Sequence, residues 1–181
     1  MGQVIVEDTR QQVARGDKHA NKHAWWDAHG VTWRREKLPF GDYVTSDGSS
    51  NRSIDTKRSL SEVAQNVGRD HARFCRECDR AREAGYRLVV LIEVGPPYRQ
   101  LDDVALWVND ACKRCQRRRA GECDPRLCVR CREYRAKPMQ GAVLLRIMRG
   151  IERDHGCRFE LCRPSRSALR ICEILGVRYE K

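Results

Sequence analysis

Two kinds of hydrophobic spacing alternate along the chain. Short apolar or alternating runs predict β-strands at residues 4–6, 31–33, 40–45, 53–57, 87–94 and 158–162. Apolar residues three or four positions apart predict helices at residues 15–29, 60–67, 69–84, 101–108, 143–151 and 165–175. The strand at 87–94 is apolar at nearly every position, which is typical of a strand buried on both faces. This alternation predicts an α/β fold with a central sheet flanked by helices.

The pattern is interrupted between Cys112 and Lys137. This segment holds ten Lys and Arg residues, three acids and five cysteines. We therefore expect a basic insertion at residues 111–137. It would separate the first part of a core, residues 1–110, from its C-terminal helix–strand–helix, residues 138–181. A chain of 181 residues is long enough for one domain with such an insertion.

Charge and cysteine content narrow the function. The chain has 36 Lys and Arg against 25 Asp and Glu, a net charge of +11, and 29 of the 36 are Arg. Arginine suits phosphate, so the balance favours a nucleic-acid partner. Neither a secretory signal nor a run of about 18 apolar residues is present, so we expect no membrane segment and a cytoplasmic location. A reducing compartment disfavours disulfides, so clustered cysteines indicate metal ligands.

A carboxylate pair and a lysine are the first candidates for chemistry. Asp55 and Lys57 are two positions apart on a predicted strand, so their side chains share a face. Asp42 lies on the preceding predicted strand and would face them across a hairpin whose turn is at residues 47–51. Carboxylates hold Mg²⁺, which activates water toward a phosphodiester, and a lysine can stabilise the developing charge. The alternative is that each is an ordinary surface charge.

The order of these motifs resembles the nuclease domain of the XPF family of structure-specific endonucleases. The strand Val4–Val6 runs into Asp8-Thr-Arg10, a Gly41-Asp42-Tyr43 arm follows, and Asp55-Thr-Lys57 precedes Glu62. The buried strand and the terminal helix–strand–helix continue in the family's order. The resemblance covers the chain outside the cysteine-rich segment and is greatest to small phage and bacterial members.

The resemblance implies a restriction-endonuclease-like core with a central mixed sheet. By matching positions, Asp42 and Asp55 would ligate Mg²⁺ or Mn²⁺ and Lys57 would be the catalytic lysine. Asp8 and Glu62 match acidic positions that assist the reaction, and Arg10 matches an arginine near the site, which could contact DNA phosphate. Two departures are visible: the family's Glu-Arg-Lys is Asp-Thr-Lys here, and no segment resembles its tandem helix-hairpin-helix module.

The basic insertion carries two CxxC pairs. Cys112-x2-Cys115 and Cys128-x2-Cys131 are separated by 12 residues, a spacing that predicts a four-cysteine site for structural Zn²⁺. Cys123 is a spare that could replace one ligand. The alternatives are a basic loop with incidental cysteines and a redox CxxC.

The arginines of the insertion are candidates for phosphate contacts. Those nearest the first CxxC pair are Arg114, Arg117, Arg118 and Arg119. With zinc they predict a DNA-gripping module. The alternative is a zinc-stabilised lid with no DNA role.

Other residues are given structural roles. Cys75 and Cys78 fall within a predicted helix and indicate core packing. Glu77 beside them could reach the catalytic strands, but a solvated helix face is expected for it. His23 is expected to face solvent or DNA. At least two of Trp25, Trp26 and Trp33 are expected in the core.

Together these features predict a metal-dependent DNA endonuclease. It would act on branched or flap DNA in recombination, repair or phage replication, in a bacterium or a phage-infected host. The family commonly pairs its nuclease domains, so a homodimer is expected. The alternative is a non-catalytic, zinc-dependent protein on a nuclease-like fold that binds nucleic acid or recruits a partner.

Overall fold

The computed structural model describes residues 3–9, 20–128 and 130–180 and contains one six-stranded sheet. The strands are β1 (Val4–Asp8), β2 (Thr32–Glu36), β3 (Tyr43–Thr45), β4 (Arg52–Lys57), β5 (Arg87–Glu93) and β6 (Arg158–Cys162). The α-helices are α1 (Ala20–Ala28), α2 (Leu60–Val67), α3 (His71–Glu83), α4 (Asp110–Arg114), α5 (Gln116–Arg119), α6 (Gly141–His155) and α7 (Ser167–Leu175). Two 3₁₀ helices, η1 (Leu101–Leu106) and η2 (Pro164–Arg166), complete the described elements.

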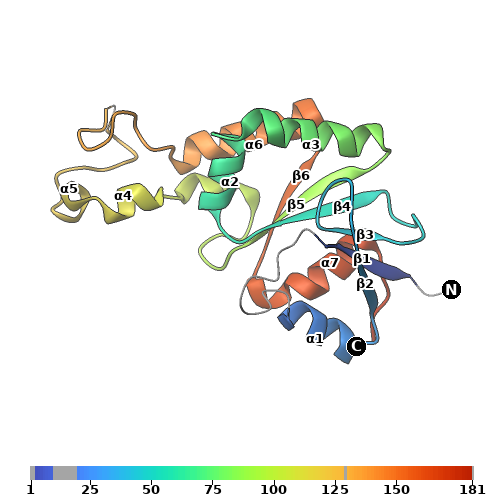
Figure 1. Cartoon of the computed structure of the whole chain (residues 1–181). Coiled ribbons are helices and arrows are strands. Elements are labelled where there is room, and N and C mark those ends of the chain that lie inside the picture. The colour runs from blue at the N-terminus through green and yellow to red at the C-terminus, as the bar shows by residue number, and fades with distance from the viewer. Residues whose placement is uncertain (1–2, 10–19, 129, 181) are drawn as a thin grey trace.

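The sheet is mixed and has helices on both faces. Its strand order is β2-β1-β3-β4-β5-β6; β3 is antiparallel to its neighbours β1 and β4, and the other neighbouring pairs are parallel. Helices α2, α3 and α6 cover one face, and α1 and α7 cover the other (Figure 1). The predicted α/β fold with a mixed sheet flanked by helices is confirmed.

Strand β5 divides the core into two hydrophobic clusters. Leu88, Val90 and Ile92 join the cluster under α2, α3 and α6, whereas Val89 and Leu91 join the cluster under α1 and α7. All five side chains are buried, because successive side chains of a strand point to opposite faces and helices cover both. The prediction that this strand is buried on both faces is confirmed.

The boundaries of several predicted elements differ from the structure by a few residues, and two of them bear on the site. The helix expected at residues 15–29 is described only from Ala20, because residues 10–19 lie outside the described part of the chain. The strand expected at 40–45 begins only at Tyr43. Gly41 has a φ of 65°, which takes the backbone out of the strand region just before Asp42.

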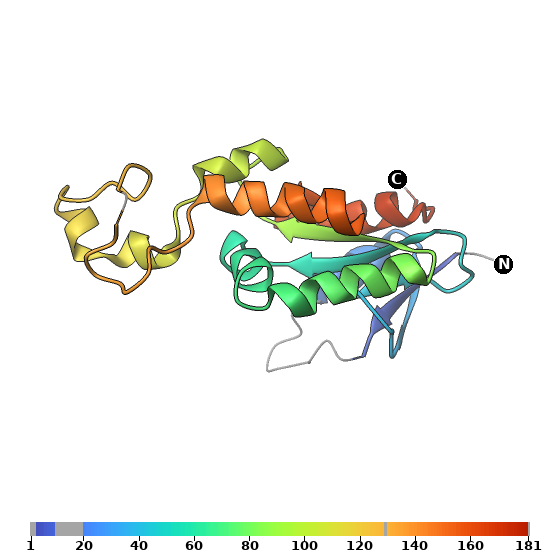
Figure 2. The same ribbon diagram turned by 90° about the horizontal axis from the view of Figure 1, so that it is seen from above.

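Between η1 and α6 the chain leaves the core as a basic arm, which we define as residues 109–139. The two ends of the arm are joined at its base, because the Gly141 amide donates a hydrogen bond to the Trp107 carbonyl at 2.9 Å. Figure 2 shows the arm projecting beyond the sheet, at the end toward which β4 and β5 run. Within the described part of the arm, Cys112 and Pro125 are the buried residues, and Leu127 is 80% exposed.

None of the helices described is both long and apolar enough to span a membrane.

Candidate active site

A tight backbone approach brings Asp42 to strand β4. The Asp42 amide donates to the Ile54 carbonyl at 2.6 Å, and Gly41 adopts its positive φ immediately before it. A Cβ atom at Gly41 would overlap the hydroxyl of Ser53 and press on the carbonyl of Ile54. Glycine is therefore required here both for its conformation and for its lack of a side chain.

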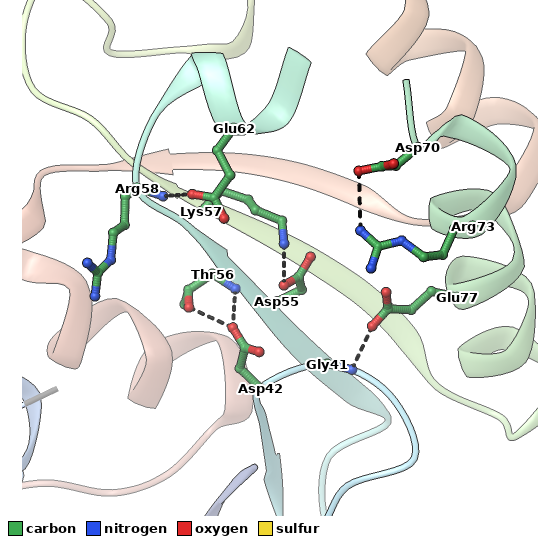
Figure 3. A network of polar contacts seen from close by, with 10 residues as sticks. All are labelled: Gly41, Asp42, Asp55, Thr56, Lys57, Arg58, Glu62, Asp70, Arg73 and Glu77. Atoms are coloured by element: carbon green, nitrogen blue, oxygen red, sulfur yellow. Dashed lines mark hydrogen bonds and ion pairs between the residues drawn. The ribbon is translucent and has the colours of Figure 1, made fainter. Parts of the chain in front are cut away.

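Asp42 is fixed by the residue between Asp55 and Lys57. Its Oδ2 accepts hydrogen bonds from the Thr56 amide and the Thr56 hydroxyl, both at 2.7 Å (Figure 3). Asp42 therefore meets β4 as expected, but from the turn before β3 and through Thr56. The sequence prediction that placed Asp42 within the strand was wrong in this detail, since Gly41 delays the start of β3 to Tyr43.

Asp55 and Lys57 lie side by side near the end of β4. Lys57 Nζ donates to Asp55 Oδ1 at 2.8 Å, in agreement with the shared strand face expected from their spacing. Asp55 is 5% exposed. Its second oxygen, Oδ2, is buried and has no hydrogen-bond partner among the residues that the structure describes. An unpaired buried carboxylate oxygen is costly unless a cation or a proton neutralises it.

The surroundings raise the pKa of both Asp55 and Lys57. Burial raises the pKa of Asp55 to about 7; the Lys57 ammonium opposes this shift, while the charges of Asp42 and Glu77 add to it. Desolvation acts to lower the pKa of Lys57, but the carboxylates of Asp55, Asp42 and Glu62 raise it overall. Lys57 is therefore positively charged at neutral pH.

Two predicted assisting acids lie at the margins of this site. Glu62 is in the first turn of α2, where its Oε2 accepts from the Arg58 amide at 2.9 Å and its charge acts on Lys57. Asp8 is buried at the end of β1, its amide donates to the Asp42 carbonyl at 2.8 Å, and its Oδ1 accepts from the Leu38 amide at 3.2 Å. Arg10, the predicted DNA contact, lies outside the described residues.

Glu77 belongs to the same site, which the sequence analysis considered but did not favour. It was expected on a solvated helix face, but the side chain is half-buried and its Oε1 accepts from the Gly41 amide at 3.2 Å. Figure 3 shows it reaching from α3 toward the Gly41 turn, beside Asp55. The spacing of α3 alone could not reveal this, because the contact depends on how α3 packs across the sheet.

The donor set is chemically suited to a hard divalent cation. Asp42, Asp55 and Glu77 bring three carboxylates together, since the charges of Asp42 and Glu77 both act on Asp55, and Asp55 Oδ2 provides a buried oxygen without a partner in the described structure. Across residues 3–9, 20–128 and 130–180, no three or more His, Cys, Asp or Glu side chains are already arranged to hold a metal ion. Mg²⁺ needs no such cage, because one or two carboxylates with waters and substrate phosphate suffice.

The cysteines of the arm lie near one another. Desolvation raises the pKa of the Cys123 thiol, as do its hydrogen bond with Cys128 and the nearby thiols of Cys115 and Cys131. Cys112 likewise lies near the thiols of Cys131, Cys128 and Cys115. The buried thiol of Cys112 also accepts from Gln140 Nε2 at 3.3 Å, at the base of the arm. The predicted zinc ligands are thus neighbours, although the described residues are not arranged as a closed site.

The arginines proposed for DNA contact differ in their surroundings. Arg114 and Arg119 are exposed. Arg117 instead forms ion pairs with Glu122 at 3.0 Å and Glu133 at 4.0 Å, and Arg118 is half-buried. Arg117 therefore pairs with acids of the arm itself, which the sequence prediction did not anticipate.

The core roles expected for cysteines and tryptophans are confirmed. Cys75 and Cys78 are buried core residues. Trp26 is fully buried, and Trp25 and Trp33 pack beside it.

His23 does not face solvent, so that expectation was wrong. Its Nε2 lies 2.9 Å from an oxygen of buried Glu7, and its ring stacks on Trp33 with centroids 3.8 Å apart. Helical spacing alone could not reveal these partners, because β1, β2 and α1 are brought together only by the fold.

Comparison with known proteins supports the fold. No protein-family model matches the chain, and no curated protein matches it in sequence. Among solved structures, "XPF from Aeropyrum pernix" is similar with a TM-score of 0.54 and 19% sequence identity, over 95% of this chain. The chain spans 63% of that structure's length. The expected likeness to XPF is therefore confirmed at the level of fold: the protein has an XPF-like α/β architecture.

Proposed function

We propose that the protein is a metal-dependent DNA endonuclease that acts on branched or flap DNA. The observation that carries this proposal is Asp55: a buried carboxylate with one oxygen on Lys57 and the other without a described partner, beside Asp42. This set stands near the end of β4 in a nuclease-like fold. A purely structural ion pair would not leave a buried carboxylate oxygen unsatisfied next to a second carboxylate.

Asp42 and Asp55 would hold the cation, Mg²⁺ or Mn²⁺. When bound, the cation supplies Lewis-acid chemistry that polarises a phosphodiester and makes water a better nucleophile. The Thr56 amide and hydroxyl fix Asp42 Oδ2, so this carboxylate is oriented before any ligand arrives. Preorganised groups of this kind lower the cost of charge development during the reaction.

Lys57 and Glu62 would manage charge and protons around the scissile phosphate. The Lys57 ammonium is held on Asp55 and stays charged, so it can stabilise negative charge that develops on phosphate oxygens. Glu62 lies close enough to influence Lys57 and can accept a proton from water. Asp8 would support Asp42 through the backbone contact between them.

The arm would grip DNA and be folded by one structural Zn²⁺. Its segment from Cys112 to Lys137 carries ten basic and three acidic residues, yet in the described part only Cys112 and Pro125 are buried. A segment without a core needs another source of folding energy, and zinc on cysteine thiolates supplies it. The ligands would be Cys112, Cys115, Cys128 and Cys131. In the alternative arrangement, Cys123 would take the place of one of these four.

The position of the arm supports its role beside the cutting site. The Ser61 hydroxyl donates to Asp110, which joins α2 to the start of α4. Ser61 precedes Glu62, so the root of the arm is tied to the element that borders Lys57. DNA held by the exposed arginines would therefore pass close to Asp42 and Asp55.

The test is cleavage of end-labelled linear, flap and four-way DNA in Mg²⁺ or Mn²⁺, with EDTA as a control. The wild-type protein should cut in a metal-dependent manner and reveal its preferred DNA structure, and Lys57→Ala should cut on the order of 10²–10³-fold more slowly. Tight binding without cleavage by the wild-type protein, weakened on zinc removal, would instead favour the non-catalytic binding protein.

A further inference from the structure

Glu77 is a carboxylate of the site to which the proposed function assigns no role. It lies on α3, on the opposite side of the site from Lys57 and Glu62 (Figure 3). Its Oε1 accepts the Gly41 amide at 3.2 Å. Because Gly41 directly precedes Asp42, this bond holds the turn from which the Asp42 side chain projects.

The position of Glu77 also has an electrostatic consequence. Its negative charge acts on Asp55, as does the charge of Asp42. The site therefore contains three carboxylates, Asp42, Asp55 and Glu77. Among the described contacts, Lys57 provides the one ammonium group that bonds Asp55. Such an excess of negative charge favours a divalent cation over water alone.

A second observation points to a ligand at this place. Asp55 is 5% exposed, and its Oδ2 lacks a partner in the described part of the chain. Figure 3 shows the Asp55 and Glu77 side chains entering the same space, one from the sheet and the other from α3. A group that balances both charges would satisfy that buried oxygen.

We propose that Glu77 is the third carboxylate of the cation site. It positions Asp42 through the Gly41 amide, and its charge strengthens binding of the cation at Asp42 and Asp55. This inference rests on the proposed function, since it assigns a further residue to the same metal centre. It does not require a preformed cage of three ligands, because Mg²⁺ and Mn²⁺ retain waters when carboxylates hold them.

Two substitutions separate the role of Glu77 in positioning Asp42 from the role of its charge in cation binding. Glu77→Gln keeps an acceptor for the Gly41 amide but removes the charge, whereas Glu77→Ala removes both. Mn²⁺ binding to the full chain would be measured by calorimetry, with thermal unfolding monitored on the same samples. We expect Glu77→Gln to weaken Mn²⁺ binding about tenfold with little change in unfolding, and Glu77→Ala to weaken binding and also lower the unfolding temperature.

The matched control is Asp79→Asn. Asp79 is two residues away on α3 but is paired with His155 at 3.0 Å and Arg82 at 3.0 Å, away from the cation site. It should leave Mn²⁺ affinity unchanged. If Asp79→Asn lost as much Mn²⁺ affinity as Glu77→Gln, the cause would be the change in overall charge, and the inference would be overturned.

A measurement on the wild-type chain avoids any dependence on variant folding. Mn²⁺ should broaden the side-chain carboxyl resonance of ¹³C-labelled Glu77 before that of exposed Glu83 on the same helix. If the wild-type protein binds Mn²⁺ but Glu77→Gln binds it equally well and Glu77 is not broadened first, Glu77 only supports the turn. If the wild-type protein binds no Mn²⁺ at all, the proposed metal centre fails together with this inference.

Discussion

The core and the arm of this protein are stabilised in different ways. The core places hydrophobic clusters on both faces of a six-stranded sheet. The arm is strongly basic and exposes Leu127, and its contacts include exposed ion pairs such as Arg117–Glu122 and cysteines that lie near one another. Exposed ion pairs contribute little to stability, so we expect the arm to need bound zinc in order to fold and the core to fold without it.

This difference suggests a division of labour. The core can hold carboxylates in fixed positions against their own desolvation, because a well-packed sheet and α3 surround them. The arm has charge and reach but no hydrophobic core of its own. We therefore expect catalysis to depend on core residues and affinity to depend on the arm, and the predictions below test that separation.

The largest effect is expected for Lys57→Ala. Removing the ammonium removes a charge that stabilises the developing negative charge, so cleavage in Mg²⁺ should fall on the order of 10²–10³-fold. DNA binding, measured by fluorescence anisotropy, should change little because the arm is untouched. If cleavage and DNA binding were lost in parallel, the core would also determine DNA affinity. That result would contradict the separation of catalysis in the core from affinity in the arm.

Zinc removal should affect the arm and spare the core. Cys131→Ser should lose the bound zinc, one ion per chain by elemental analysis, and expose the arm to limited proteolysis. The melting temperature of the core should shift by no more than about 3 °C. Cys123→Ser is the control, and it should keep its zinc if Cys112, Cys115, Cys128 and Cys131 are the ligands. Proteolysis within the sheet after zinc loss would contradict the account.

Asp55 should make the metal-free core less stable as pH rises. Because its pKa is raised to about 7 from an ordinary value near 3.8, the folded state holds a proton that the unfolded state has released. The stabilisation is complete below the unfolded pKa and is lost as pH rises through about 7. In urea unfolding, the free energy of unfolding of Asp55→Asn should exceed that of the wild type by about 2 kcal/mol at pH 8. This difference should vanish near pH 4. An equal difference at both pH values would exclude this cause.

The smallest effect is expected within the arm and distinguishes its arginines. Arg119→Ala should lower DNA affinity several-fold and reduce the slope of log affinity against log salt by about 0.9, the value for one phosphate contact. Arg117→Ala should leave that slope unchanged, because this side chain pairs with Glu122 and Glu133. Equal slopes for the two variants would mean that exposure does not determine which arginines meet phosphate.

The elements and much of the site could be predicted from the sequence because their determinants are local. The alternation around β5, the spacing of Asp55 and Lys57 and the cysteine pairs are each contained in a few consecutive residues. The motif order then predicted the fold, which the likeness to a solved XPF structure confirms. Whether zinc and Mg²⁺ bind remains a prediction.

The contacts that the sequence did not reveal depend on packing between distant segments. Glu77 enters the site only because α3 lies across the Gly41 turn, and His23 meets Glu7 only because α1 packs beside β1. Arg117 looks like its arginine neighbours in sequence but finds Glu133 across the arm. Helical and strand periodicity identify a buried face, but they do not identify the partner on the other side.

The division between core and arm is tested most directly by measuring DNA binding and single-turnover cleavage on the same samples of three proteins. These are the wild type, Asp55→Asn and a variant in which Arg114 and Arg119 are replaced by alanine. The account predicts that Asp55→Asn binds like wild type but does not cut. It also predicts that the arginine variant binds weakly but cuts at the wild-type rate once DNA is saturating. Cleavage that survives in Asp55→Asn would contradict the account.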